Sequence, residues 1–288
     1  MRLVYTADLH GHIASYRSLL DLAVATGAQA AIVGGDLLPH AIRLQGAIEF
    51  QRDFIATQLR PLLAAFRARQ PGVAVYLLAG NDDWAGAIAA LDDLEREGLA
   101  LPLHERVYPL VAPGGGQGLW LAGYACVPLT PFSIKDYERR DDRPLPPFSF
   151  DMAYQSWGGE IRRVDGAAIE AWPSIDEALA ALARQSDPRR TIYVCHTPPS
   201  DTPLDQMPRD KHVGSRALRA FIERHAPPLT LHGHIHEAPQ ITGRYTTRLG
   251  DTWSVNPGHV PRRFQAVSLD TDDIAGTIEH TVFGRLNV

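Results

Sequence analysis

The first third of the chain alternates between two hydrophobic periods, and this alternation restricts the possible folds more than any other feature of the sequence. Three short apolar runs predict strands, at residues 3–6, 30–33 and 73–78. Between them, residues 15–25 carry an apolar helical face, and residues 48–66 follow helical spacing with a kink expected at Pro61. This order of strands and helices predicts a parallel sheet covered by helices.

The last third of the chain returns to strands. Five runs predict them, at residues 191–195, 229–232, 253–256, 264–269 and 277–283, and a sixth lies earlier, at residues 119–124. The spacing of the last three suits antiparallel pairing. Helices are predicted at residues 174–184 and 215–225, the first with Ser174 as N-cap and Glu177 in a capping box. The whole pattern predicts a mixed α/β sandwich.

The middle of the chain is less regular. We expect residues 128–173 to form an irregular insertion over or beside the core. Within it, residues 135–143 hold four charges of each sign, which predicts a solvated surface. Since no break in composition marks a second unit, we expect a single domain over residues 1–288.

Composition excludes several classes of protein. With 45% hydrophobic and 21% charged residues, the chain is neither disordered, collagen-like nor a coiled coil. A net charge of -5 gives no sign of a polyanion-binding surface, although a local basic patch stays open. The two cysteines cannot build a disulfide framework. The start of the chain is too polar for a signal peptide, and no apolar run approaches about 20 residues, so we expect a cytoplasmic protein with no membrane partner.

Polar residues follow the predicted strands, where open α/β sheets place their ligand sites. Seven of them carry metal-ligating groups: Asp8, His10, Asp36, Asn81, His196, His234 and His236. Carboxylates and imidazoles together suit borderline divalent ions such as Mn, Fe, Co, Ni or Zn. Seven ligands exceed what one catalytic ion with an open position can use, but they suit two ions sharing a carboxylate. Each residue alone is weak evidence, since Asp after glycine is more often a turn or cap residue.

The ordered set of motifs is more specific than its parts. It reads Asp8-Leu9-His10, Gly35-Asp36, Gly80-Asn81-Asp82-Asp83, His196 and Gly233-His234-Ile235-His236. This order resembles the calcineurin-like metallophosphoesterases. The segments His196-Thr197-Pro198-Pro199, Gly214-Ser215 and Asn256-Pro257-Gly258 look like the Icc-related bacterial and archaeal branch of that family.

The resemblance implies a fold, a site and a reaction. The fold would be a four-layer αββα sandwich, with two mixed sheets flanked by helices. Asp8, His10 and His236 would hold one metal ion, Asn81, His196 and His234 the other, and Asp36 would bridge both. The reaction would be hydrolysis of a phosphoester by in-line attack of a metal-bridging hydroxide. Asp36, Asn81, Asp82 and His196 would then be the catalytic residues.

Asp82 departs from the family pattern, because many members have a histidine at this position that assists the leaving group or binds substrate. A carboxyl group donates a proton only if its pKa is raised, and an anionic Asp82 would repel a phosphomonoester dianion. We therefore predict a preference for phosphodiesters, or for activated leaving groups that need little acid assistance. The alternative is that Asp82 caps the following helix and touches no substrate.

Three further histidines are candidates for contact with substrate. His40 follows the Asp36 loop and is placed to contact phosphate or replace the missing acid. His12 lies two residues after His10, and as the plainer reading it is a loop histidine. His212 precedes Gly214-Ser215 and either caps a helix or reaches the substrate.

Three functions remain for comparison. The first is a dinuclear phosphoesterase acting on a small phosphoester or nucleotide, since net acidity argues against long nucleic acid. The second is a metal-binding interaction scaffold with little catalysis. The third is a mononuclear zinc hydrolase using His234, His236 and a carboxylate, which leaves Asp36, Asn81 and His196 unexplained.

Overall fold

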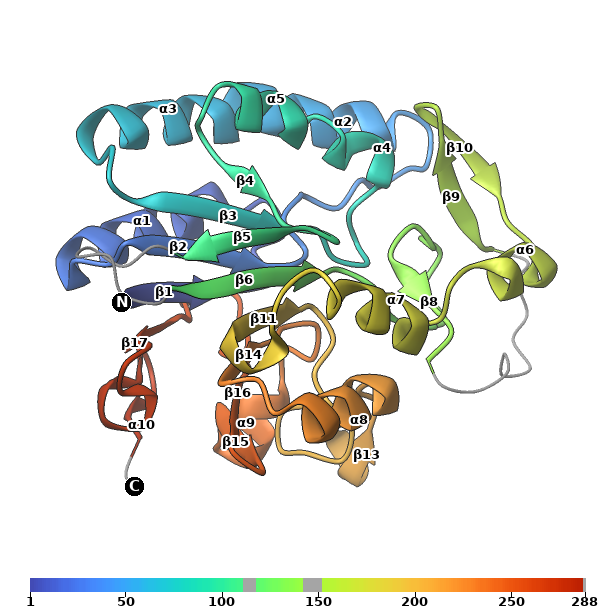
Figure 1. Cartoon of the computed structure of the whole chain (residues 1–288). Coiled ribbons are helices and arrows are strands. Elements are labelled where there is room, and N and C mark those ends of the chain that lie inside the picture. Colours follow the sequence, from blue (N-terminus) through green and yellow to red (C-terminus); the bar gives the residue numbers. More distant parts are fainter. Residues whose placement is uncertain (111–117, 142–151, 287–288) are drawn as a thin grey trace.

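Two large mixed sheets form the centre of the structure, a computed structural model that describes residues 1–110, 118–141 and 152–286 (Figure 1). The first sheet has the order β19-β18-β17-β1-β2-β3-β4, and the second has the order β15-β16-β14-β11-β6-β5. The first contains β1 (Arg2–Thr6), β2 (Ala30–Gly34), β3 (Ala74–Leu78), β4 (Leu101–Pro102), β17 (Val267–Asp270), β18 (Glu279–His280) and β19 (Gly284–Arg285). The second contains β5 (Val107–Leu110), β6 (Leu119–Tyr124), β11 (Thr191–Cys195), β14 (Leu229–Leu231), β15 (Thr246–Leu249) and β16 (Thr252–Val255).

Helices cover the outer face of each sheet. The first sheet is covered by α1 (Ile13–Thr26), α2 (Ala47–Phe54), α3 (Arg60–Arg69), α4 (Ala85–Ile88) and α5 (Leu91–Arg96), and the second by α7 (Ile175–Leu182) and α8 (Arg216–His225). Strand alternation produces this layering. In β1, Tyr5 belongs to the core that joins the sheets, whereas Val4 packs with the helices of the other face. The predicted four-layer αββα sandwich is confirmed.

Strand pairing agrees with the sequence in the first third and differs in part near the end. β1, β2 and β3 pair in parallel, as predicted. β16 pairs antiparallel with β15 but parallel with β14. The antiparallel pairing predicted for residues 253–256 is therefore confirmed on one side of the strand and wrong on the other. The strand predicted at residues 277–283 is confirmed only in part, because β18 (Glu279–His280) pairs antiparallel with β17 but is shorter. Its predicted start belongs to α10 (Ile274–Thr277), where Asp273 accepts a hydrogen bond from Gly276 N and begins a helical turn.

The long helical segment is interrupted close to the predicted kink. Between α2 and α3 lies one π-helical stretch, η1 (Ile55–Leu59), and Pro61 follows within the first turn of α3. Proline has no backbone N–H to donate and its ring crowds the preceding turn, so the wider π-turn accommodates it without ending the helix.

The middle segment contains a charge cluster that is buried, not solvated. Lys135 and Glu138 are 3% and 0% exposed, and Lys135 Nζ lies 2.7 Å from Glu138 Oε2 and 2.9 Å from the Thr130 carbonyl oxygen. The prediction of a solvated surface over residues 135–143 was wrong here, because charges of opposite sign three residues apart satisfied each other in the interior.

Other described elements of the middle segment are β7 (Val127–Pro128), β8 (Glu138–Arg139), the hairpin β9 (Tyr154–Trp157) and β10 (Glu160–Arg163), and α6 (Gly166–Ala171). Asp136 attaches the hairpin to the core: its carboxylate accepts from Ala85 N at the start of α4 and from Ser156 N in β9, both at 2.8 Å. Residues 142–151 of the predicted insertion lie outside the described residues. The single-domain assignment stays a prediction.

The remaining described elements are short: η2 (Pro188–Arg190), β12 (Gln206–Met207), η3 (Pro208–Asp210), β13 (Lys211–His212) and α9 (Ala238–Thr242). The predicted capping box at the start of α7 is confirmed, with Ser174 and Glu177 bonding reciprocally. In the parts of the chain that the structure describes, no helix has the length and apolar character to cross a membrane.

Candidate metal centre

The seven strand-end residues meet at one place, between the carboxyl ends of the two sheets. The first sheet contributes Asp8 and His10 after β1, Asp36 after β2, and Asn81 after β3. The second sheet contributes His196 after β11, and His234 and His236 after β14. Segments more than 200 residues apart in the chain thus lie in contact, as His10 and His236 do with ring nitrogens 3.4 Å apart.

Asp8 lies at the centre of one group of ligands. Its Oδ1 is 3.3 Å from His236 Nε2, and His236 Nε2 is 3.4 Å from His10 Nε2. One ligand atom each from Asp8, His10, Asp36 and His236 fall within 4.8 Å of one another. This is the spacing of atoms that can share a single cation.

A second group forms around His196. Its Nε2 is 3.3 Å from Asp36 Oδ2 and 3.9 Å from Asp8 Oδ1, and its ring centroid is 5.3 Å from that of His234. Asn81 is 2% exposed and its neighbour Asp82 donates a backbone N–H to Asp36 Oδ1 at 2.9 Å. Asp36 therefore has one oxygen facing His196 and lies between the two groups.

The backbone at the strand ends is unusual. Asp8, His10, Asp36 and His234 all have positive φ, at 59°, 44°, 48° and 64°, a region that non-glycine residues rarely occupy. Such strain persists where the surroundings over-determine it, and it clusters at functional sites. Gly80 is required by close approach: a Cβ there would lie 2.1 Å from Asp36 Oδ1 and 2.7 Å from His196 Nε2.

The donor set fits a divalent cation. Among the described residues, three buried ligand atoms have no hydrogen-bond partner: His10 Nδ1, Asn81 Oδ1 and His196 Nε2. His196 Nδ1 lies 2.9 Å from the Gly34 carbonyl oxygen, to which it donates, so the neutral imidazole would have its lone pair on the Nε2 that faces the carboxylates. Buried polar atoms without partners are costly, and a coordinated cation would satisfy them.

The buried carboxylates of the cluster also favour positive charge beside them. Burial opposes protonation of His196 and His236, but the carboxylates of Asp36 and Asp8 outweigh it and raise the pKa of each imidazole to about 9. Burial likewise opposes ionisation of Asp36, yet neighbouring His196 holds its pKa well below the usual range. Two fully buried carboxylates thus require cationic partners, which protons or metal ions can supply.

Asp83 ties two ligand loops together. Its fully buried carboxylate accepts backbone N–H groups from Leu37 and Leu38, after Asp36, and from Gly80, before Asn81, all within 2.9 Å. The residue therefore fixes the loop that follows β2 against the loop that follows β3.

Asp82 points into the site and does not cap a helix. The next helix, α4, has Trp84 at its N-cap position without a side-chain bond, so the capping alternative was wrong. The side chain of Asp82 is 23% exposed and accepts from Asn81 Nδ2 at 3.2 Å. Its Oδ2 lies 3.8 Å from His10 Nδ1. Burial, and then the charge of Asp36, raise the pKa of Asp82 to about 7.

The three weaker histidine candidates have different surroundings. His40 reaches the cluster: its ring stacks on His10 at 4.6 Å between centroids, and its Nε2 lies 3.5 Å from Asp82 Oδ2. His12 is the N-cap residue of α1 and its Nδ1 bonds Ser15 Oγ at 2.8 Å. His212 does not cap α8, whose N-cap is Ser215, and instead pairs with Asp205 at 2.7 Å.

Sequence reasoning missed two residues beside the cluster. The His259 ring lies 5.8 Å from His236 and 6.0 Å from His10 between centroids. Its position directly after Asn256-Pro257-Gly258 was the available signal. Gln51 hydrogen-bonds two of the loops, and no sequence signal marks a single glutamine on a helix.

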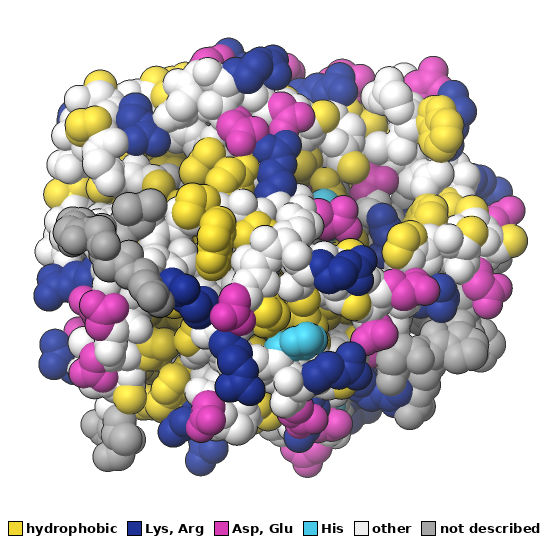
Figure 2. All heavy atoms as spheres, viewed as in Figure 1, with side chains coloured by type: hydrophobic (Ala, Val, Ile, Leu, Met, Phe, Trp, Pro, Cys, Tyr) yellow, Lys and Arg dark blue, Asp and Glu magenta, His cyan; other side chains and the backbone are white. Residues whose placement is uncertain are grey.

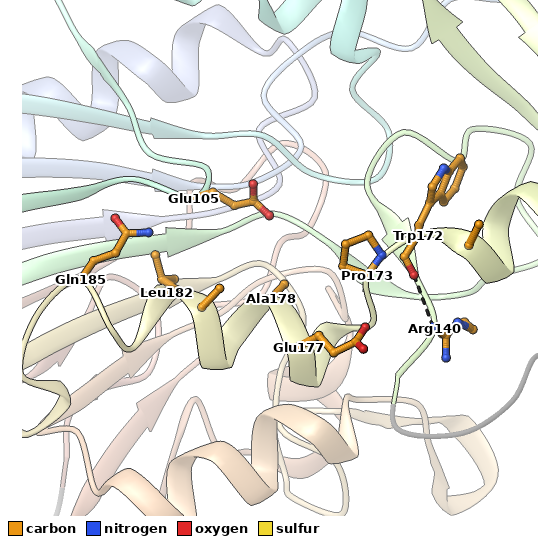
Figure 3. A pocket seen from close by; sticks show the side chains of 10 residues that line it. Glu105, Arg140, Trp172, Pro173, Glu177, Ala178, Leu182 and Gln185 are labelled. Carbon is orange, nitrogen blue, oxygen red and sulfur yellow. Dashed lines mark hydrogen bonds between the residues drawn. The ribbon is translucent and has the colours of Figure 1, made fainter.

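A separate cavity lies elsewhere, and none of the seven residues lines it. It measures about 650 Å³ and lies between α7 and the segment around Trp172, with Glu105 and Gln185 at its other side (Figure 3). Arg140 Nη2 donates to the Trp172 carbonyl oxygen at its rim, 3.3 Å away. Among the described residues, the groups that could hold a metal ion lie at the strand-end cluster and not at this cavity.

Comparison with known proteins gives a family match. The model of the family described as calcineurin-like phosphoesterase matches residues 1–238. No curated protein matches the chain.

Solved structures share the fold at low sequence identity. One crystal structure has a TM-score of 0.63 at 17% identity, covering 98% of this chain and 99% of that chain. The protein TT1561 of Thermus thermophilus has a TM-score of 0.56 at 18% identity, covering 98% of each chain. A dimetal phosphatase from Danio rerio has a TM-score of 0.48 at 12% identity, covering 93% of this chain and 91% of that chain. At these identities the first two show a shared fold, and the third adds no argument.

Proposed function

Because the chain belongs to the calcineurin-like phosphoesterase family, we propose that its strand-end cluster holds two divalent metal ions and hydrolyses phosphodiesters. Membership by itself makes the chain a metal-dependent hydrolase of phosphoesters. The number of ions, their ligands and the class of ester are the substance of the proposal.

The convergence of seven ligating side chains carries the two-ion proposal. Asp8, His10 and His236 would hold one ion, Asn81, His196 and His234 the other, and Asp36 would be shared. Three buried ligand atoms without partners and the position of Asp36 between the two groups support this division. When bound, two divalent ions neutralise phosphate oxygens and make a hydroxide nucleophile available near neutral pH.

The chain's own residues orient the site. The bond from His196 Nδ1 to the Gly34 carbonyl fixes the imidazole plane, and the bond from Asp82 N to Asp36 Oδ1 fixes the shared carboxylate. Both are held before substrate arrives, so little reorganisation is needed during the reaction. The donor set suits Mn, Fe, Co, Ni or Zn.

Asp82 supports the preference for diesters. Its carboxylate is partly exposed beside Asn81 and His40, where a bound phosphate would lie close to it. Nearby cations favour the ionised form of a carboxyl group, so we expect Asp82 to be anionic in the loaded enzyme at neutral pH. One extra negative charge on a monoester at about 6 Å costs roughly 1–3 kcal/mol at intermediate effective dielectric.

A small phosphoester or nucleotide is the proposed substrate class. The net charge of -5 gives no general attraction for a polyanion, and Lys and Arg side chains are interspersed with Asp and Glu on the face in Figure 2. Long nucleic acids bind chiefly through many phosphate contacts with basic side chains.

The test uses the whole chain, stripped of metal and reloaded with Mn. Initial rates on a generic aryl phosphodiester and its monoester would be measured with the metal-to-protein ratio. Two ions per chain with faster diester turnover support the proposal. One ion at saturation would favour the mononuclear hydrolase, faster monoester turnover would overturn the diester preference, and bound metal without any turnover would favour the scaffold.

A further inference from the structure

We infer that Gln51, on α2, is a positioning residue that holds the His40 loop and the Asp82 loop in register. The inference deepens the proposed function and rests on it, because it concerns the two side chains that would meet the substrate. Gln51 belongs to none of the sequence motifs, and its side-chain hydrogen bonds go to loop backbone and not to the seven candidate ligands.

The Gln51 amide bonds three backbone groups in two loops. Nε2 donates to the Pro39 carbonyl oxygen at 3.2 Å and to the Asp82 carbonyl oxygen at 3.1 Å. Oε1 accepts from Trp84 N at 2.9 Å. One side chain therefore joins the residue before His40 to the residues on both sides of Asp83.

Burial shows that these bonds are the reason for glutamine at this position. Gln51 is 1% exposed, and the other buried residues of α2 are apolar: Ala47, Ile48 and Phe54. An amide placed on such a face costs free energy unless its donors and acceptor are all satisfied. Here both hydrogens and the oxygen have backbone partners, so the amide is held in a single orientation.

The two loops meet at their side chains as well. His40 Nε2 lies 3.5 Å from Asp82 Oδ2, and the His40 ring stacks on His10. His40 is 59% exposed, so few contacts of its own side chain restrain it. The hydrogen bonds from the Gln51 side chain to the backbone of both loops therefore set where His40 and Asp82 meet.

Asp83 performs a separate task, which makes the role of Gln51 testable. Asp83 bonds Leu37, Leu38 and Gly80, which flank Asp36 and Asn81. With Asp83 intact, loss of Gln51 should leave the ligand cluster in place and displace only the His40–Asp82 pair. Metal content and substrate turnover should then respond differently.

The experiment compares Gln51→Met, which keeps the volume but makes no strong hydrogen bond, with Ile55→Val, a buried change about one turn further along, at the start of η1. Metal content, kcat and KM for an aryl phosphodiester are measured on the Mn-loaded full chain. We expect Gln51→Met to bind metal as the wild type does and to lose about 10- to 100-fold in kcat/KM. Ile55→Val should stay within about twofold of the wild type.

A double-mutant cycle separates positioning from general loosening. In a His40→Ala background, Gln51→Met should cost less than about threefold, because the contact between His40 and Asp82 that it sets is gone. If the losses in kcat/KM caused by Gln51→Met and His40→Ala multiply fully in the double variant, the inference is overturned. Wild-type activity of Gln51→Met, or loss of bound metal from that variant, would also overturn it. If Gln51→Met fails to fold, Gln51→Glu replaces it in the same cycle, since its carboxylate keeps an acceptor for Trp84 N and at neutral pH has no donor for the two carbonyls.

Failure of the proposed function would look different. It would show in the wild type, as absent diester turnover or a metal ratio near one. Failure of the inference would show only in the variants of an active wild type.

Discussion

The loops at the ends of the two sheets are stabilised in different ways. Those of the first sheet brace one another: Asp83 joins the loop after β2 to the loop after β3, and Asp82 N bonds Asp36. The second-sheet loop that carries His234 and His236 is held from its own side by Asn256, whose Nδ2 lies within 3.3 Å of three carbonyl oxygens, those of Leu204, Gly233 and Ile235. From the first sheet, Asp8 accepts from His234 N at 3.0 Å.

The difference follows the charge of the ligands. Both carboxylates come from the first sheet, and buried anions need fixed donors and cations around them. The second sheet contributes imidazoles, which are less costly to bury when neutral, and His196 is itself oriented by a first-sheet carbonyl, that of Gly34. The first sheet therefore sets the geometry, and the second sheet completes it.

The largest expected effect comes from removing the residue where the two halves meet. Asp36→Ala should lower diester turnover by about 10³-fold or more and reduce bound metal below two ions per chain, because the shared carboxylate is lost. Initial rates and metal analysis after Mn loading test this. Asp21→Ala, an exposed carboxylate on α1, is the matched control and should behave as the wild type. Full metal content in Asp36→Ala would contradict its shared position.

Asn256→Leu should weaken the second-sheet loop that carries His234 and His236 and leave the first-sheet loops unchanged. Asn256 is fully buried and also accepts from Gly258 N at 2.9 Å, so its loss removes four hydrogen bonds to backbone groups and should cost about 3 kcal/mol of unfolding free energy. Metal affinity should weaken by about 10- to 100-fold, as for other residues that orient ligands.

Val255→Ala is the control for this loss of stability, since it removes buried apolar volume from the neighbouring position of β16. We expect it to destabilise the fold without weakening metal binding. Equal metal affinity in the two variants would mean that the loop needs no support from Asn256.

A pH experiment tests the junction of the sheets. His104 lies between β4 and β5 and accepts a hydrogen bond from Ala125 N at 3.1 Å, and burial lowers its pKa to about 3. The unfolded chain takes up the proton below pH 6.5, whereas the folded chain does not, so the free energy of unfolding falls as the pH falls. At pH 5 the loss is about 2 kcal/mol relative to pH 8.

Denaturant titrations of the wild type and of His104→Asn at pH 8 and pH 5 would isolate this contribution. The asparagine oxygen offers an acceptor for Ala125 N but does not titrate, so the variant should lose about 2 kcal/mol less on acidification. An identical pH dependence of both proteins would show that folding does not lower the pKa of His104.

The smallest predicted effect concerns Asp82, in the braced first-sheet loops. Asp82→His should lower the ratio of diester to monoester kcat/KM by about tenfold, because it removes the charge that repels a dianion. Asp82→Asn should shift the ratio in the same direction, which separates loss of charge from gain of an imidazole. A ratio unchanged in both variants would leave Asp82 without a role in selectivity.

Local signals in the sequence predicted most elements and the set of candidate ligands. Strand runs such as residues 30–33 and 73–78 are short and continuously apolar because both of their faces are buried, and the polar groups after them mark the strand ends. The Ser174 capping box is likewise a local interaction, so four neighbouring residues suffice to predict it.

Contacts between distant segments were beyond those signals. The charge pattern of residues 135–143 reads as surface, and only the fold reveals that Lys135 and Glu138 neutralise each other inside it. The same holds for Asp82, which local preference allowed as a helix cap and which lies instead beside His40. His259 and Gln51 joined the site through neighbours far away in the sequence.

By itself, the sequence determined the layered α/β architecture and the chemical types gathered at the strand ends, because hydrophobic period and motif order are properties of neighbouring residues. Only the tertiary structure decided which atoms face one another: Asp36 between His196 and the Asp8 group, Asp82 against His40, and Gln51 between their loops. Those relations depend on how two sheets stack and how their loops approach, and burial then fixes them through hydrogen bonds that no single segment contains.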